Sequence, residues 1–310
     1  MSEPSPVSET RGEGAPLGRR RQLDELVAEL RPELHRYCAR MTGSVADGED
    51  VVQDTLIRAY QALPELETLP PLRPWLFRIA QNRALDHLRR YERRMGRPIE
   101  LVVHTAAVLD PDPEGALARG EAVRAALARF VLLAPAQSSA VILKDVLGHS
   151  LGEIAALLEL SVPAVKAALH RGRTRLRELN RAADLAPRPP APEPSPVVAR
   201  YARLFNARDW DGIRALLADD VRLDVVSVSK RHGRRDVEVY FTNYAAFERC
   251  HLVPGSLDGR EVLAAFDRGD DRPGYFIEVS VNGERIASIR DYRHVPYILQ
   301  DAEVVLTDLE

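Results

Sequence analysis

The chain of 310 residues contains only two cysteines, Cys38 and Cys250, and they stand far apart. Neither belongs to a CxxC pair or to a metal-ligand spacing, so the sequence predicts no disulfide framework, no metal site and no cofactor. No apolar run reaches the ~18–20 residues that a bilayer span requires, and the N-terminus lacks the apolar core of a signal peptide. We therefore expect a cytoplasmic protein without a membrane partner.

A strong net charge is also missing, since the formal balance is −3. The charges are nevertheless segregated along the chain. Two stretches are strongly basic, Arg73–Arg97 and Lys166–Arg181, whereas six acids between Asp47 and Glu67 face only Arg58. Segregation of this kind fits a protein with two nucleic-acid faces and at least one other surface. Solvated helix faces have the same composition, so charge alone leaves both interpretations open.

The length favours two or three folded units. We expect a disordered tail over 1–18, a helical domain over 19–97, a linker over 98–114, a second helical domain over 115–182, a proline-rich spacer over 183–196 and an α+β domain over 197–310. The first domain should hold three or four helices, with breaks at Thr42–Ser44 and Asp47–Gly48. The spacer is marked by six prolines between Pro187 and Pro196. That composition favours an extended tether.

The last domain opens with a helical pattern over Val197–Leu217. A further helix is expected over Arg235–Phe247. Strand-like runs follow or flank it at Val221–Val226, Glu261–Phe266, Tyr275–Val281, Arg285–Arg290 and Glu303–Leu306. Helices first and antiparallel strands last, without strict alternation, indicate the α+β class.

The middle of the chain carries the pattern of a helix-turn-helix. Ser150 and Glu153 form a capping box that begins a short helix over Leu151–Glu159. Ser161 can cap a second helix, with Pro163 in its first turn, that runs to about Leu179. Basic side chains stand on one side of this second helix at helical spacing, namely Lys166, His170, Arg173 and Arg177. A basic stripe on such a helix can read a major groove, although a surface helix of a bundle would carry the same pattern.

The helix expected over Trp75–Arg94 has two unlike faces. Apolar side chains gather on one side, and the opposite side presents Asn82, Asp86, Arg89 and Arg93. Amide, carboxylate and guanidinium groups together can hydrogen-bond unstacked bases and hold a nucleic-acid backbone, as melted single-stranded DNA requires. A surface network of the same residues is the alternative.

Two strings of residues resemble one family, the extracytoplasmic-function sigma factors of bacterial RNA polymerase. Glu49–Tyr60 followed by Pro74–Arg90 resembles their region 2, and Leu143–Arg173 resembles their region 4. The resemblance covers about residues 23–182. It implies promoter-directed transcription initiation, with core RNA polymerase and promoter DNA as partners and no enzymatic activity.

The resemblance also implies roles for single residues. The acidic face formed by Asp50, Gln53 and Asp54 would dock on the clamp coiled coil of the polymerase. Asn82 and Asp86, with Arg89 and Arg93 on the same face, would contact the melted minus-ten element. The minus-thirty-five element would be read by Lys166, His170, Arg171 and Arg173.

Residues 197–310 resemble the SnoaL-like domains, in which a curved sheet wrapped by helices forms a cone-shaped pocket. The matching stretches are Arg200–Trp210, Leu216–Asp224 and Ile289–Tyr297. Candidate pocket residues are Asp224, Asp291, Tyr292, His294 and Tyr297. They carry the side chains of acid–base chemistry, but no catalytic spacing is recognisable. We therefore expect a regulatory domain that either binds a small-molecule ligand or makes a contact with polymerase or, within the chain, with the sigma domains.

Two other functions stay open at this point. One is a helix-turn-helix regulator that acts without polymerase, and the other is an enzyme with an unrelated DNA-binding part. The acidic face around Asp50 separates the first of these from a sigma factor, because only a sigma factor needs it to bind polymerase.

Overall fold

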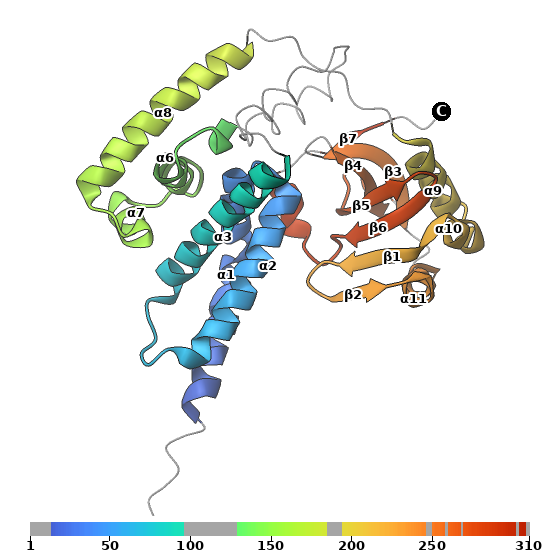
Figure 1. The fold of residues 1–310 in the computed structure, drawn as a ribbon, viewed down its shortest axis with the longest axis horizontal. Helices are drawn as coiled ribbons and strands as arrows, with labels where there is room; N and C mark the ends of the chain where they lie inside the picture. The colour runs from blue at the N-terminus through green and yellow to red at the C-terminus, as the bar shows by residue number, and fades with distance from the viewer. Residues whose placement is uncertain are drawn as a thin grey trace, which may run out of the picture.

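The computed structural model describes residues 14–95, 129–184, 194–245, 250–257, 260–267, 269–301 and 304–307 (Figure 1). The linker expected over 98–114 lies outside these residues, as do most of the expected tail and most of the proline-rich spacer. No helix within the described ranges is long and apolar enough to span a bilayer.

The first helical domain consists of α1 (Gly14–Thr42), α2 (Val45–Ala62), the 3-10 turn η1 (Leu63–Glu65) and α3 (Leu72–Met95). The break expected at Thr42–Ser44 is present, and Ser44 caps α2 by accepting from the backbone N–H of Asp47. The break expected at Asp47–Gly48 is wrong, because α2 continues through it. A Cβ at position 48 would lie 2.6 Å from the backbone of Ala39. Gly48 therefore allows α1 and α2 to pack closely and does not end a helix.

The second helical domain contains α6 (Pro135–Val141), the π-helical segment η2 (Ile142–Val146), α7 (Leu151–Leu158) and α8 (Val162–Asp184). The capping box of Ser150 and Glu153 is confirmed, with both of its hydrogen bonds formed. Glu159 then takes a left-handed conformation with φ of 55° and turns the chain toward α8. The helix-turn-helix pattern therefore folds as the local capping signals predict, although α8 extends past the expected end near Leu179.

The two helical domains share one continuous hydrophobic core. Polar contacts add to it across their boundary. The hydroxyl of Tyr37 on α1 lies 2.8 Å from the hydroxyl of Ser139 on α6, and His149 Nε2 lies 2.6 Å from Glu33 Oε1. The helix-turn-helix is thus packed against the first domain.

The C-terminal domain is α+β, as predicted. Its helices are α9 (Pro196–Asn206), α10 (Trp210–Leu216), α11 (Arg234–Ala245) and the 3-10 turn η3 (Pro296–Asp301). Its strands are β1 (Leu217–Val225), β2 (Ser229–His232), β3 (Cys250–Leu257), β4 (Arg260–Asp267), β5 (Tyr275–Asn282), β6 (Arg285–Asp291) and β7 (Val305–Leu306).

These strands form one mixed sheet in the order β2-β1-β6-β5-β4-β3-β7. The pair β1 and β6 is parallel, and the other pairs are antiparallel. The sequence did not predict β2 or β3. The β2 segment Ser-Lys-Arg-His lacks apolar alternation, and β3 contains Pro254 and Gly255, which are depleted in strands.

Both faces of the sheet are covered. The inner face packs against α9, α10 and α11, with Tyr201, Phe205 and Phe241 in its core. The outer face forms a second core with η3 and with Val45 and Ala46 of α2. Figure 1 shows the orange-to-red sheet lying beside the blue helices α1 and α2. Region-2-like helices and the C-terminal domain are therefore in direct contact.

Candidate functional site

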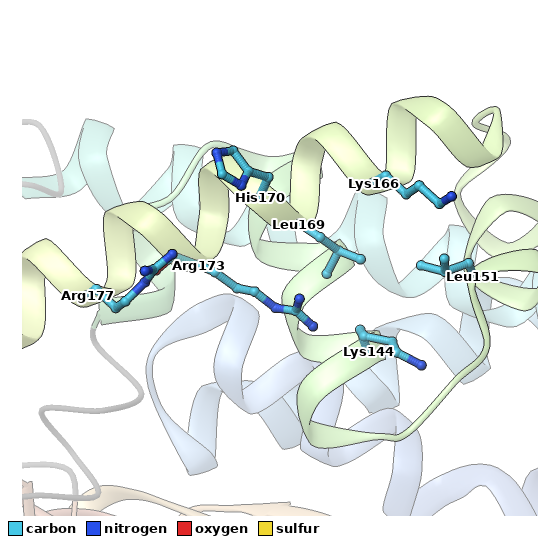
Figure 2. Close-up of a pocket in the computed structure, with 7 residues that line it drawn as sticks. All are labelled: Lys144, Leu151, Lys166, Leu169, His170, Arg173 and Arg177. Atoms are coloured by element: carbon cyan, nitrogen blue, oxygen red, sulfur yellow. The ribbon is translucent and has the colours of Figure 1, made fainter.

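Helix α8 lines a basic groove (Figure 2). Its basic side chains are Lys166, His170, Arg173 and Arg177 of α8 together with Lys144 of η2. Leu151 and Leu169 add apolar surface to the same groove. Three of the expected minus-thirty-five residues are thus brought together, whereas Arg171 is exposed on α8 and is not among the lining residues.

Two contacts hold this groove in shape. Arg173 forms a two-point ion pair with Asp145, at 2.9 and 2.6 Å, and this hydrogen bonding raises the pKa of the guanidinium. Lys144 Nζ donates to the carbonyl of His149 at 3.0 Å. Helical spacing along α8 could not reveal Lys144, because it comes from a different element that only the turn after η2 brings alongside.

The expected single-strand face of α3 is present as a mixed polar surface. Asn82, Arg89 and Arg93 are exposed. Asp86 is paired with Arg83 at 2.6 Å and with Arg89 at 3.6 Å. The carboxylate of Asp86 therefore pairs with two guanidinium groups of α3.

The expected docking face of α2 is divided. Asp54 is exposed, and Gln53 is partly buried with an Nε2 atom that finds no hydrogen-bond partner among the described residues. Asp50 is bound by Arg290 of β6, through Nη1 at 3.2 Å and through a shorter contact from Nη2. The C-terminal domain thus occupies the part of the face that Asp50 provides.

Two neighbouring acids of α2 are bound in the same way. Arg260 of β4 donates to both carboxylate oxygens of Asp47, at 2.9 and 2.8 Å. Glu49 is fully buried and accepts from Tyr297 of η3 and from Arg31 of α1, each at 2.7 Å. We call the contacts of Asp47, Glu49 and Asp50 with the C-terminal domain the α2 interface.

The charges at the α2 interface shift the acidity of its carboxyls. Burial raises the pKa of Asp47, but the imidazole of His87, with Nε2 3.7 Å from Oδ2, and the guanidinium of Arg260 outweigh burial and hold this pKa at about 2. Burial raises the pKa of Asp50, and Arg290 offsets that rise only in part. Asp47 is therefore the more firmly ionised of the two anchors.

The structure does not gather the five candidate pocket residues into one pocket. Asp291 lies on the inner face of the sheet, and Tyr292 packs on the outer face against Phe276. Tyr297 belongs to the α2 interface, and His294 is exposed. Asp224 is near Arg290 and Lys230 at 3.6 and 3.5 Å. Asp291 ends β6 and Tyr292 follows it, and successive residues of extended backbone point to opposite faces, which separates residues that are close in sequence.

Family models match three segments of the chain. The model described as Sigma-70 region 2 matches residues 26–94, Sigma-70 region 4 matches residues 123–176, and the SnoaL-like domain matches residues 198–288. The order agrees with the three domains seen in the fold.

Several proteins are similar to this chain. The ECF RNA polymerase sigma factor SigG of Mycobacterium tuberculosis is 35% identical over 229 residues, which are 67% of this chain and 62% of SigG. The chain thus spans less than two thirds of that relative. SigL of the same species, also an ECF RNA polymerase sigma factor, is 37% identical over 145 residues, which are 44% of this chain and 76% of SigL.

Among solved structures, the M. tuberculosis extracytoplasmic function sigma factor SigJ has 23% identity and a TM-score of 0.34, covering 87% of this chain and 95% of its own. A putative ketosteroid isomerase from Kribbella flavida has 24% identity and a TM-score of 0.26, covering 31% of this chain and 73% of its own. With the match to SigL and the ordered region 2 and region 4 segments, the chain belongs to the family of ECF RNA polymerase sigma factors.

Proposed function

We propose that this protein directs core RNA polymerase to specific promoters and acts without catalysing a reaction of its own. The observation that carries the proposal is the basic groove of a capped helix-turn-helix, where Lys166 and His170 of α8 stand beside Lys144. Lys and Arg side chains on such a helix bind phosphates and the guanine acceptors of a major groove. In this proposal the groove binds the minus-thirty-five element.

The first helical domain supplies the other two contacts in this proposal. The mixed face of α3, with Asn82, Asp86, Arg89 and Arg93, takes the melted minus-ten strand, because amide and guanidinium groups suit unstacked bases. The acidic face of α2, with Asp50, Gln53 and Asp54, docks on the polymerase. An acidic docking face requires a basic partner surface.

We further propose that the C-terminal domain restrains the sigma domains by masking. Support comes from the α2 interface, where Arg290 takes the carboxylate of Asp50 that polymerase would need. Arg290 and a polymerase surface cannot bind the carboxylate of Asp50 at the same time. Polymerase binding then requires the C-terminal domain to leave α2.

The packing of the two helical domains supports a restrained state as well. Arg78 of α3 forms an ion pair with Glu159 in the helix-turn-helix. Asn82 lies about 6 Å along α3 from Arg78, and Lys166 lies at most about 25 Å along the chain from Glu159. Even with the two side chains added, Asn82 and Lys166 are less than about 50 Å apart. On B-DNA the minus-ten and minus-thirty-five elements of a promoter, which are about 25 base pairs apart, are separated by about 85 Å, at ~3.4 Å per base pair. The domains would therefore separate before both elements are bound.

Run-off transcription with core polymerase tests the promoter assignment. The full chain should initiate at defined start sites on genomic template, which sequencing of the transcripts identifies. Lys166→Ala with His170→Ala should lower specific initiation at least tenfold while leaving core binding intact, since one good base contact is worth about 1–3 kcal/mol. Arg175→Ala is the matched control, because Arg175 is exposed on α8 but does not line the groove.

Core binding is tested with the exposed Asp54→Arg variant, whose position outside the α2 interface spares the fold. Loss of co-purification with core polymerase is the expected result. Undiminished binding would contradict the docking assignment and favour a regulator that binds DNA without polymerase.

A further inference from the structure

The end of β6 connects the two faces of the C-terminal sheet within four residues. Arg290 and Tyr292 point to the outer face, where Arg290 holds Asp50 and Tyr292 stacks on Phe276 with ring centroids 4.3 Å apart. Asp291 points to the inner face, and so does Arg293, which follows the strand. The same stretch of backbone therefore carries an anchor of the α2 interface and a group of the inner core.

The inner group is a buried polar cluster. Asp291 is 1% exposed and accepts from the hydroxyls of Tyr240 and Tyr244 at 2.9 and 2.7 Å. The hydroxyl of Tyr244 lies 2.9 Å from that of Tyr275, to which Arg293 donates at 3.0 Å. A buried carboxylate is costly unless its hydrogen bonds are made, and well-packed apolar residues are often as stable. Stability alone therefore does not explain why this cluster is polar. A role in fixing the position of the end of β6 explains it better.

The position of Asp291 constrains its neighbours. The backbone N–H of Arg293 donates to Asp291 Oδ1 at 2.8 Å, and the backbone N–H of Tyr292 donates to the carbonyl of Phe276 at 3.1 Å. A strand is stiff over one residue, so a shift of Asp291 in the inner core also shifts Arg290. Arg290 reaches Asp50 only from its present place, because hydrogen bonds weaken steeply with distance and angle.

We propose that the cluster of Tyr240, Tyr244 and Asp291 is a positioning device that sets how tightly the C-terminal domain holds α2. Breaking its hydrogen bonds loosens the α2 interface without a change in any residue of that interface. The inference rests on the proposed masking for its consequence in transcription, but the docking itself is a property of the free chain.

Hydrogen exchange of the full chain, without polymerase, tests the proposal. Tyr244→Phe removes one donor to Asp291 and keeps the ring. We expect exchange to rise about tenfold in η3 and in the first turns of α2, where Val45 and Ala46 meet the outer face. Peptides of α9, which packs on the inner face, should change less than twofold. Tyr240→Phe should behave in the same way.

Tyr201→Phe is the matched control. Tyr201 is fully buried in the same inner core, and its hydroxyl finds no hydrogen-bond partner among the described residues, so its loss should leave exchange in α2 unchanged. A uniform rise in both inner and outer peptides would mean that the tyrosines only stabilise the domain, and no rise in α2 would mean that β6 does not transmit the change. Either result overturns the proposal. If docking loosens but polymerase affinity stays the same, the masking proposal fails while this one stands.

Discussion

Replacing Arg290 with alanine should strengthen the binding of core polymerase. Arg290 donates two hydrogen bonds to Asp50, and its side chain is 20% exposed. Its guanidinium also lies 3.6 Å from Asp224 and 3.8 Å from Glu278. Arg290→Ala removes these attractions and leaves three carboxylates near one another.

The magnitude follows from the contacts that are lost. A hydrogen bond to a charged group contributes about 1.5–3 kcal/mol, and the partly exposed Asp50 places this pair in the lower half of that range. A loss of about 2 kcal/mol in docking corresponds to about a 30-fold shift between the masked and the open form. When the masked form dominates, the apparent Kd for polymerase falls by the same factor.

Titration of labelled core polymerase with the full chain measures this effect. The control is Arg222→Ala, since Arg222 is an exposed arginine of β1 in the same sheet. Circular dichroism and thermal melting should show that both variants remain folded. If the Kd for polymerase is unchanged or higher in folded Arg290→Ala, the masking argument is refuted. Loss of the Arg290 contact would then not have made Asp50 more available to polymerase.

Two further predictions concern α2. Gly48→Ala should destabilise the first helical domain by about 1–3 kcal/mol, because the Cβ of the alanine would lie 2.6 Å from the Ala39 backbone. The measurement is the melting temperature, which should fall. An unchanged melting temperature would show that α1 and α2 can move apart without loss of stability. The second prediction concerns acid. Because the pKa of Asp47 is held at about 2, below its ordinary 3.8, the stability it contributes should be complete above about pH 4 and be lost as the pH falls toward 2. The raised pKa of Asp50 acts in the opposite sense, so the original chain is compared with Asp47→Asn, in which only the Asp47 contribution is missing. Hydrogen exchange in η3, measured from pH 7 to pH 2.5, should lack the acid-dependent loss of protection in the variant. Equal pH profiles for the two proteins would contradict the role given to Asp47.

The local features of this protein followed from its sequence. The capping box of Ser150 and Glu153 depends on residues three apart, so their spacing alone predicts where α7 begins. Short strand-like runs predicted β4, β5 and β6 to within one residue of their bounds. The basic stripe of α8 was visible for the same reason, since side chains three or four apart share a helix face.

The tertiary structure decided the rest. Gly48 reads as a helix break until α1 is seen against it, and Lys144 joins the basic groove only through the turn that follows η2. The sequence grouped five candidate pocket residues into one set, yet Asp291 at the end of β6 and Tyr292 just after it point to opposite faces of the sheet. Most of all, Asp50 and Arg290 are 240 positions apart, and no local periodicity relates them. Spacing along the chain determines helices, caps and faces, whereas which faces meet depends on the burial of apolar surface and the pairing of charge between distant segments.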